Sequence, residues 1–542
     1  MSTNYIEAII ESDIESKKTE QVQTRFPPEP NGYLHIGHAK SLCINFGMAD
    51  KYNGTCYLRY DDTNPSKEGE EFVKSIEEDI AWLGFKWKEI RFASSYFDIT
   101  YALALDLIDK GLAYVCDYSA EQIKQTRGNL TEAGQNSIFR SRSVEENRQL
   151  FIDMKNGKFA DGEKSLRAKI DMASPNLNMR DPIIYRILRA THHNTGDKWC
   201  IYPMYDFAHP IEDAVEGTTH SLCTLEFEDH RPLYNWVIEN CTHKYFKSIP
   251  QQIEFARLNL TDTIMSKRFL KALVDNKKVM GWDDPRLPTL CGIRRKGFPS
   301  QAIKDFCNRI GVSKANSEVE WGYLESCVRE HLNTSCDRVM AVANPVKVTI
   351  IDCQDELLDI ENNPNEQVQT YRKVSFGSQI YIDGADFALV PPPKYYRLKP
   401  DGYVRLKGAY IIHCDSYKLD KEGNVIEVIC SKVPNSKSGQ DTSGVKVKGV
   451  IQWVDATNCL TATVRHFGKL LREGSEELPL LERLSDNSLT ENEILVENSL
   501  KNSKVGQSYQ FIRNGYYCLD KDACKDKLIF NEIVPLKDNF NK

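Results

Sequence analysis

The first half of the chain alternates between strand-like and helix-like patterns of apolar residues. A strand is predicted at 22–26; it ends in the turn Pro27-Pro28-Glu29-Pro30-Asn31-Gly32, and apolar residues recur at helical spacing from 34 to 52. The same rhythm predicts a helix at 71–83 and strands at 56–60, 199–205, 220–227 and 253–260. This order predicts a parallel, doubly wound sheet that binds ligands at the carboxyl ends of its strands.

Two segments of this half depart from the rhythm. Residues 1–20 form a short acidic stretch with apolar residues on one side, which predicts an N-terminal amphipathic helix. The stretch 100–196 is irregular and rich in Arg and Asn, as an inserted domain would be. We therefore expect the sheet to be built from residues 21–99 and 197–265.

In the second half of the chain the spacing of the apolar residues changes. Residues 266–338 are predicted to be helical, and from 339 to 542 the apolar residues alternate with a period of two between Asp, Gly and Pro turns. This pattern predicts two β-barrels or sandwiches, whose inner boundary the sequence does not fix. A predicted strand covers 445–454, and the acidic, weakly patterned stretch 473–502 is expected to be a loop.

Composition limits the class of protein without revealing a partner. The chain has 542 residues, several times a typical domain, and its 41% hydrophobic and 27% charged residues are ordinary for a globular protein. The formal net charge of -7 argues against a surface that wraps nucleic acid everywhere, while it permits a local basic track.

No export signal or run of eighteen apolar residues is present, so we expect neither secretion nor a membrane-spanning helix. The 16 cysteines are scattered without a Cys-x-x-Cys pair, which predicts reduced thiols and no structural metal. The sequence therefore favours a cytoplasmic protein.

Two histidines follow the first predicted strand. His35 and His38 fall in the first turn of the next helix, on one face, beside the free N–H groups and the positive end of the helix dipole. Such a corner suits polyanions and can stabilise charge on a transferring phosphate. Alone, the His-x-x-His pattern also fits surface histidines or half of a metal site.

A second candidate lies after the strand predicted at 253–260. The run Met265-Ser266-Lys267 places a lysine on a loop, where it can close over ATP phosphates, although solvated basic residues are the common alternative. The chain has no G-x-x-x-x-G-K-[ST] loop, so a P-loop is excluded as the source of any ATP use.

Together, Pro27 to His38 and Met265 to Lys267 closely resemble the two signatures of class I aminoacyl-tRNA synthetases, in particular of the glutaminyl/glutamyl group. The resemblance implies an α/β Rossmann-type catalytic domain, an inserted acceptor-stem-binding domain, a helical connector and C-terminal anticodon-binding β-barrels. It also implies ATP-dependent ligation of L-glutamine to tRNA(Gln) through a glutaminyl-adenylate, with transfer to the 2′-OH of the terminal adenosine.

The resemblance implies roles for residues at matching positions. His35, His38 and Lys267 would stabilise the reacting phosphates of magnesium-bound ATP. The residues expected to contact ATP are Glu29, Pro30, Asn31, His35, Ile36, Gly37, His38, Ala39, Lys40, Ser41, Thr224, Arg257, Leu258, Met265, Ser266 and Lys267. The residues expected to bind glutamine are Asp61, which would hold its ammonium, Tyr205, which would read its side chain, and Arg25, Cys223 and Gln252 nearby.

The same resemblance implies contacts with tRNA. Leu130 matches an apolar wedge that opens the terminal base pair, and Asp229 matches an acid that reads the acceptor stem. The expected anticodon contacts are Arg338, Arg397, Gln510 and Arg513, whereas Tyr396 stands where some relatives place a basic residue. Enzymes of this group require bound tRNA for the first step, and we expect the same of this chain, acting as a monomer.

Three alternatives compete with this interpretation. An archaeal or eukaryotic glutamate-specific enzyme shares the signatures and the barrels, although 205–209 and 221–227 resemble the glutamine branch. An RNA-binding paralogue without catalysis would be expected to lose His35, His38, Asp61 or Lys267, and all four are present. A nucleotidyltransferase shares the histidine corner, but such enzymes are far shorter.

Overall fold

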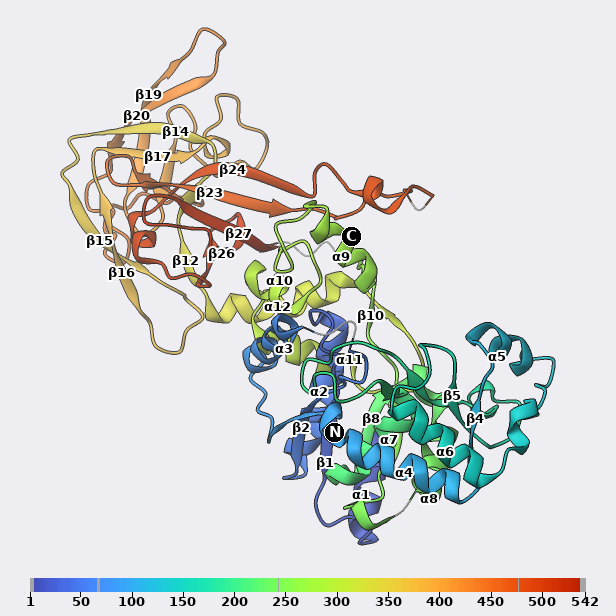
Figure 1. Ribbon diagram of the computed structural model, residues 1–542. Helices are drawn as coiled ribbons and strands as arrows, with labels where there is room; N and C mark the ends of the chain where they lie inside the picture. Colours follow the sequence, from blue (N-terminus) through green and yellow to red (C-terminus); the bar gives the residue numbers. More distant parts are fainter. Residues whose placement is uncertain (1–3, 66–68, 242, 476, 537–542) are drawn as a thin grey trace. The chain divides into compact units, whose positions relative to one another are not determined.

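The computed structural model describes residues 4–65, 69–241, 243–475 and 477–536 (Figure 1). The chain divides into two compact units, one formed by 1–260 and 307–319 and the other by 261–306 and 320–542. The domain boundaries predicted from the sequence stay predictions. Among the described residues, no helix has both the length and the apolar character that a bilayer crossing requires.

The first unit begins with the predicted N-terminal helix and the doubly wound sheet. Strand β1 pairs in parallel with β2, and β2 with β3. Strands β8 and β9 form a second parallel pair, and β8 lies beside β1, because the N–H of Thr219 donates to the carbonyl of Gln23 (2.9 Å). The elements are α1 (Tyr5–Glu15), β1 (Gln23–Phe26), α2 (Ile36–Lys51), β2 (Thr55–Tyr60), α3 (Glu70–Trp82), β3 (Ile90–Phe92), η1 (Ala93–Tyr96), α7 (Tyr205–Glu216), β8 (His220–Thr224), η4 (Leu225–His230), α8 (Arg231–Asn240), η5 (His243–Tyr245), β9 (Gln251–Phe255), β10 (Asn259–Leu260) and β11 (Glu318–Val319).

Between β3 and α7 the irregular stretch of sequence folds around an antiparallel sheet of order β4-β5-β6-β7. Its core continues into α7 and α8, since Phe151, Leu166 and Tyr202 belong to the same buried cluster as Phe207 and Val237. The elements are α4 (Phe97–Asp109), β4 (Ala113–Cys116), α5 (Ala120–Arg127), η2 (Ile138–Ser141), α6 (Val144–Lys155), β5 (Ser165–Ala168), η3 (Leu177–Met179), β6 (Ile183–Ile187) and β7 (Ile201–Pro203).

The second unit begins with the predicted helices, followed by two seven-stranded sheets of orders β21-β18-β19-β20-β14-β17-β22 and β12-β25-β26-β27-β23-β24-β13. Its helices are α9 (Lys267–Asp275), α10 (Leu290–Lys296), α11 (Ser300–Ile310), whose last turn falls within the first unit, and α12 (Trp321–Ser335). Each sheet has a buried apolar cluster, centred on residues such as Trp453 in the first and Phe511 in the second.

The first sheet and the adjacent hairpin comprise β14 (Pro345–Ile351), β15 (Glu356–Glu361), β16 (Tyr371–Phe376), β17 (Gln379–Asp383), η6 (Gly384–Asp386), β18 (Tyr403–Leu406), β19 (Ile411–Leu419), β20 (Val425–Lys432), β21 (Val450–Ile451) and β22 (Val454–Asp455). The second comprises β12 (Asp337–Val339), β13 (Ala341–Val342), β23 (Leu460–Phe467), η7 (Leu480–Arg483), β24 (Leu489–Val496), η8 (Asn498–Asn502), β25 (Ser508–Phe511), β26 (Gly515–Leu519) and β27 (Leu528–Pro535). In Figure 1, β19 and β20 form a long hairpin, and β23 and β24 lead into the extended loop that carries η7.

Several predictions of secondary structure were wrong. The strand expected at 220–227 ends at Thr224, where the 3-10 helix η4 begins, and the strand expected at 253–260 is interrupted after Phe255. The strand expected at 199–205 ends at Pro203, and Tyr205 begins helix α7 instead. The stretch 473–502, expected to be a loop, contains β24, which pairs with β23 along eight residues. The single strand expected at 445–454 is two short strands, β21 and β22, which lie at opposite edges of their sheet.

Candidate functional site

The carboxyl ends of four parallel strands carry most of the predicted small-molecule contacts. Strand β1 leads into the proline-rich turn, β2 ends immediately before Asp61, β8 ends at Thr224, and β9 ends just before Arg257 and Leu258. Parallel strands present these ends at one edge, where ligands bind in doubly wound folds. In register, Thr224 lies opposite Phe255, so the residues after β9 come close to the end of β8.

His35 and His38 form the corner that opens α2. His35 is the N-cap residue, and its Nδ1 accepts the backbone N–H of Gly37 at 3.1 Å. The N–H of His35 in turn donates to Nδ1 of His38 at 3.1 Å, and the two ring centroids are 3.9 Å apart. Because each Nδ1 is an acceptor, each neutral ring carries its proton on Nε2. The corner therefore combines two imidazole donors with the positive end of a helix, which suits an anion such as a phosphate.

The remaining predicted ATP residues divide between the two units. In the first, the Asn31 amide donates to the Glu29 carboxylate, and Thr224 Oγ1 donates to Glu226 Oε1 at 2.6 Å. In the second, Ser266 is the N-cap of α9 and Lys267 is its exposed first residue. The structure places Met265 to Lys267 at the start of a helix, and their closure on ATP stays a prediction.

Asp61 is a buried carboxyl group one residue beyond β2. Its Oδ1 accepts the hydroxyl of Thr63 at 2.8 Å and the Thr63 N–H at 3.3 Å. Burial raises the pKa of Asp61 to about 6, against the lowering effect of the Thr63 hydroxyl, and the charge of Glu29 raises it further. A carboxylate held in this way gains most when a cation such as an ammonium neutralises it.

Tyr205 and Gln252 meet at one small cavity. It is lined by Tyr205, Asp206, His209, Phe227, His230 and Gln252, together with Pro210 and Tyr234. The Tyr205 ring stacks on His209, with centroids 4.9 Å apart, and burial raises the pKa of its hydroxyl. The charges of Arg25 and Asp61 also act on that hydroxyl, so the structure brings together Asp61, Tyr205, Gln252 and Arg25. Cys223 belongs to the same group, since its Sγ faces the carbonyl of Ile253 beside Gln252 and influences Tyr205.

A buried network of ion pairs includes Arg25 and Asp213, whose charges act on the Tyr205 hydroxyl. The Arg25 guanidinium donates to Asp213 (3.0 Å), to the carbonyl of Leu222 (3.0 Å) and to Ser221 Oγ (2.6 Å). Arg59, which is also fully buried, donates to the same Asp213 carboxylate at 2.7 Å. These pairs stabilise one another, because removing one partner would leave a charge buried without compensation.

His209 sits between the two arginines. Nη2 of Arg25 is 2.8 Å from its Nε2, and Nη2 of Arg59 is 2.9 Å from its Nδ1. Burial, followed by these two positive charges, holds the pKa of His209 well below its usual value despite Asp213, so the ring is neutral. His209, Arg59 and Asp213 were not predicted from the sequence as site residues. The His209-x-x-x-Asp213 spacing, with both polar residues on the buried face of α7, was the available signal.

The predicted acceptor-end contact Leu130 lies on an exposed loop. The Leu130 side chain is 80% exposed, which is unusual for leucine and is compatible with an apolar wedge. Its loop is held by the buried Arg180, whose Nη1 donates to the carbonyls of Arg127, Asn129 and Glu132 at 2.8–3.0 Å. Arg180 was not predicted, and the sequence gives no local signal for it.

Asp229 lies in η4 with its side chain exposed. Its backbone carbonyl accepts hydrogen bonds from the side-chain amides of Asn176 (2.7 Å) and Asn178 (3.1 Å), which lie between β3 and α7 in the chain. These bonds fix the backbone of Asp229 and leave its carboxylate at the surface, where a nucleic-acid base can reach it.

Arg338 and Gln510 are neighbours although 172 positions separate them in sequence. They are register partners in the parallel pair of β12 and β25, and Gln510 lies opposite Tyr516 in β26. Register partners share a face of a sheet, so an arginine, an amide and an aromatic ring stand in one row. The Arg338 guanidinium and the Tyr516 hydroxyl both donate to Asn333 Oδ1, at 3.2 and 3.4 Å. The Tyr516 ring is buried, so the partly exposed Arg338 and Gln510 are the members of this row that an unstacked base can reach.

Arg397 and Arg513 converge on one buried carboxylate. Nη1 of Arg397 is 3.1 Å and Nη2 of Arg513 is 2.8 Å from Oδ1 of Asp386. Asp386 is fully buried, and burial raises its pKa against the lowering effect of both arginines. Asp386 was not predicted from the sequence. Because the two guanidinium groups are partly exposed and share an anchor, they form a preorganised cationic pair.

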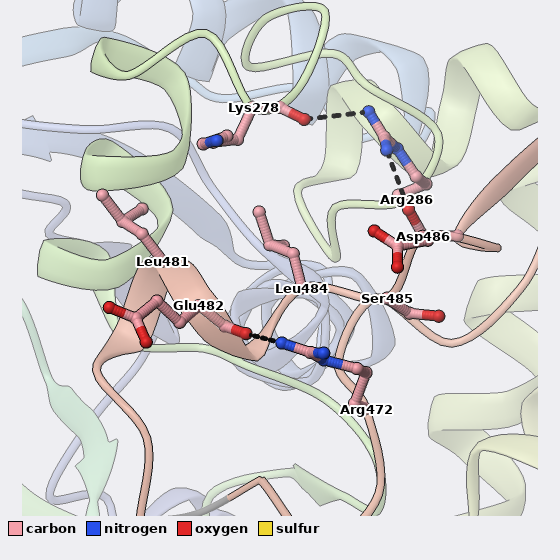
Figure 2. Close-up of a pocket in the computed structure, with 9 residues that line it drawn as sticks. Lys278, Arg286, Arg472, Leu481, Glu482, Leu484, Ser485 and Asp486 are labelled. Carbon is pink, nitrogen blue, oxygen red and sulfur yellow. Dashed lines mark hydrogen bonds between the residues drawn. The ribbon is translucent and has the colours of Figure 1, made fainter.

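None of the residues predicted for the site lines a polar pocket of the second unit. Figure 2 shows Lys278 and Arg286 facing Arg472 and the segment 481–488 across this pocket. Arg286 donates to Ser488 Oγ at 3.0 Å and Arg472 donates to the carbonyl of Glu482, so these cations are engaged within the protein. We assign it no role in the chemistry.

Comparison with known proteins gives the same assignment along nearly the whole chain. Residues 21–334 match the family model for the catalytic domain of class I tRNA synthetases (E and Q), and residues 336–432 and 450–520 match two models for their anticodon-binding domains. Similar curated proteins are glutamine–tRNA ligases from Clostridium perfringens (53% identical, 99% of this chain and 98% of that protein), Clostridium kluyveri (53%, 99% and 98%) and Rhodopirellula baltica (50%, 100% and 91%). The chain therefore belongs to the class I tRNA synthetases of the E and Q group.

Proposed function

We propose that this protein is a cytoplasmic glutamine–tRNA ligase that acts as a monomer. Glutamine would react with magnesium-bound ATP to give glutaminyl-adenylate and pyrophosphate. The 2′-OH of the terminal adenosine of tRNA(Gln) would then take the acyl group and release AMP. No covalent intermediate with a side chain is needed, so positioning and charge stabilisation supply the rate.

The observation that carries the proposal is the group around Asp61. A buried carboxylate that gains from an ammonium lies within electrostatic range of Tyr205, whose cavity also contains Gln252. An amino acid bound by its ammonium at Asp61 would extend its side chain toward a hydroxyl and an amide. Buried polar groups that must be paired favour a side chain with matching donors and acceptors.

The charge state of this cavity favours an amide over a carboxylate at the end of the substrate. Arg25, whose charge acts on the Tyr205 hydroxyl, is already paired with Asp213 at 3.0 Å, and Arg59, which shares Asp213, is also paired with Glu216 at 3.1 Å. His209, which stacks on Tyr205, is held neutral. A glutamate side chain would therefore bring a negative charge to a site without an uncompensated cation, at a cost in desolvation.

ATP would bind at the histidine corner. Nε2–H of His35 and of His38 would donate to phosphate oxygens, and Lys267 would add a positive charge from the start of α9. The tRNA would contact Leu130 and Asp229 with its acceptor end. The row of Arg338 and Gln510, together with the Arg397–Arg513 pair, would contact the unstacked anticodon bases.

The experiment that tests this function is ATP–pyrophosphate exchange with purified full-length protein. We expect exchange only when glutamine and tRNA(Gln) are both present. Exchange driven by glutamate in place of glutamine would overturn the substrate assignment, and exchange without tRNA would overturn the expected requirement for tRNA in the first step.

A further inference from the structure

A buried cluster adjoins Asp61 on its carboxyl-terminal side. The Asp62 cluster consists of Asp62, Ser94, His192, His193 and Asn194. Asp62 is fully buried, and its carboxylate accepts the Ser94 N–H (2.7 Å), the Ser94 hydroxyl (2.6 Å), the Asn194 amide (3.0 Å) and Nε2 of His193 (3.0 Å). One carboxylate therefore joins the end of β2, the turn η1 and the loop 188–200 between β6 and β7.

The donor atoms of this cluster also have the spacing of a metal site. Asp62, His192 and His193 each offer one ligand atom, and these atoms lie within 4.8 Å of one another. The hydrogen bonds of His192 argue against a metal site. Nδ1 of His192 accepts the N–H groups of Asn194 (3.1 Å) and Thr195 (3.3 Å), so the proton of the neutral ring is on Nε2. A protonated Nε2 has no lone pair for a metal ion.

Nε2–H of His192 donates instead to the backbone carbonyl of Asp62 at 2.6 Å. This ring is buried, and burial lowers its pKa, so it stays neutral and keeps the same proton near pH 7. The two nitrogens of His192 thus have separate tasks. Nδ1 shapes the loop 192–196, and Nε2–H fixes the backbone at Asp62.

Two hydrogen bonds fix the backbone on the two sides of the Asp61 α-carbon. Its own N–H donates to the carbonyl of Pro28 at 3.0 Å, and the next residue is fixed by His192 and by the other members of the Asp62 cluster. The Asp61 carboxylate is itself oriented by the hydroxyl and the N–H of Thr63, so its position depends on the course of the backbone through residues 61–63. The Asp62 cluster imposes this course from the inserted domain, because the sheet β4-β5-β6-β7 carries the loop of His192.

We propose that His192 is a positioning residue for the amino-acid site: its Nε2–H bond to the Asp62 carbonyl holds Asp61 toward the substrate ammonium. This inference rests on the proposed role of Asp61 in amino-acid binding. It assigns a role in substrate affinity to a loop of the inserted domain, in addition to the tRNA contacts expected of that domain.

Two substitutions separate the two tasks of His192. His192→Gln places an amide donor near the position of Nε2 and loses the Nδ1 acceptor, whereas His192→Asn keeps an acceptor near Nδ1 and loses the donor to Asp62. We expect His192→Asn to raise the KM for glutamine about tenfold, as loss of one buried hydrogen bond does, with the KM for ATP unchanged. We expect His192→Gln to keep the KM for glutamine within about threefold of the wild type.

The measurement is aminoacylation by the full chain, with KM for the amino acid and for ATP determined separately. The reverse order, with His192→Gln impaired and His192→Asn near normal, would show that His192 only shapes its loop and would overturn the proposal. The proposal would also be overturned if His192→Asn and His192→Gln had the same KM for glutamine as each other. The matched control is the same pair of substitutions at His413, whose ring nitrogens bond Asp415 (2.8 Å) and Asp401 (3.0 Å) in the second unit. The control variants should leave the KM for glutamine unchanged.

His193→Ala provides a second test in case the His192 variants do not fold. The His193 side chain is partly exposed, so its removal is less disruptive than a change at the buried His192. This substitution removes one contact to the Asp62 carboxylate, and we expect a KM for glutamine raised about threefold with the KM for ATP unchanged. An unchanged KM for glutamine would count against the Asp62 cluster as a positioning device. If the wild type charges tRNA with another amino acid, the proposed function fails, and the variants are then compared with that amino acid as substrate.

Discussion

Replacement of Asp61 by asparagine is expected to stabilise the protein while abolishing tight amino-acid binding. Burial raises the pKa of this carboxyl group from 3.8 to about 6. Each pKa unit corresponds to 1.36 kcal/mol, so ionisation of Asp61 in the folded protein costs about 3 kcal/mol relative to the unfolded chain. Asparagine keeps Oδ1 as an acceptor for the two Thr63 donors and carries no charge.

The pH dependence of this effect has a definite sign. The folded pKa lies above the unfolded one, so the folded protein binds more protons between pH 4 and 6. The contribution of Asp61 to the free energy of unfolding is therefore lost as the pH rises through this window, and the full cost is present above pH 6. We expect Asp61→Asn to be more stable than the wild type by up to about 3 kcal/mol at pH 8, with the gain shrinking toward zero near pH 4.

The assay is thermal unfolding of both proteins at pH 5 and pH 8, without ligands. The control is Asp98→Asn, because Asp98 is 70% exposed and pairs with Lys198 at the surface, so a change of only a few tenths of a kcal/mol is expected. An Asp61→Asn variant that melts below the wild type at pH 8, or a difference that does not depend on pH, would refute this reasoning about Asp61.

Three further predictions follow from the site. The KM for glutamine should rise about tenfold per pH unit below pH 6, because protonated Asp61 cannot pair the ammonium; a KM that is flat between pH 5 and 7 would contradict this. Lys267→Ala should slow adenylation in pyrophosphate exchange by about 100-fold with little loss of tRNA binding, and the opposite pattern would refute its role. Asp386→Asn should raise the KM for tRNA roughly tenfold by freeing Arg397 and Arg513, and an unchanged KM for tRNA would show that the arginines need no shared anchor.

Local sequence was sufficient for the part of the site that depends on local structure. The strand, turn and helix around His35 and His38 follow from residues that are close in the chain, and the predicted corner has the expected geometry. Tyr205 was placed in the wrong element, because Pro203 ends the strand and a helix begins two residues later. Strand β24 was missed because its exposed residues are polar and its pairing partner β23 lies beyond a long loop.

The remaining contacts depend on tertiary structure. The pairing of Arg25 and Arg59 with Asp213 joins two strands to a helix more than 150 residues away, and no local pattern signals such a pair. Arg338 and Gln510 were named from family resemblance, and only the sheet shows that they are register partners. Asp386 and His192 each act through side chains from distant segments, so they become visible as part of a site only in the folded chain.

The central claim is that Asp61, Tyr205 and their surroundings select glutamine for ligation to tRNA(Gln). Its most direct test is charging of tRNA(Gln) and tRNA(Glu) with labelled glutamine and labelled glutamate, measured side by side with the full chain. We expect glutamine to be attached to tRNA(Gln) and the other three combinations to remain at background. Efficient attachment of glutamate to either tRNA would contradict the account.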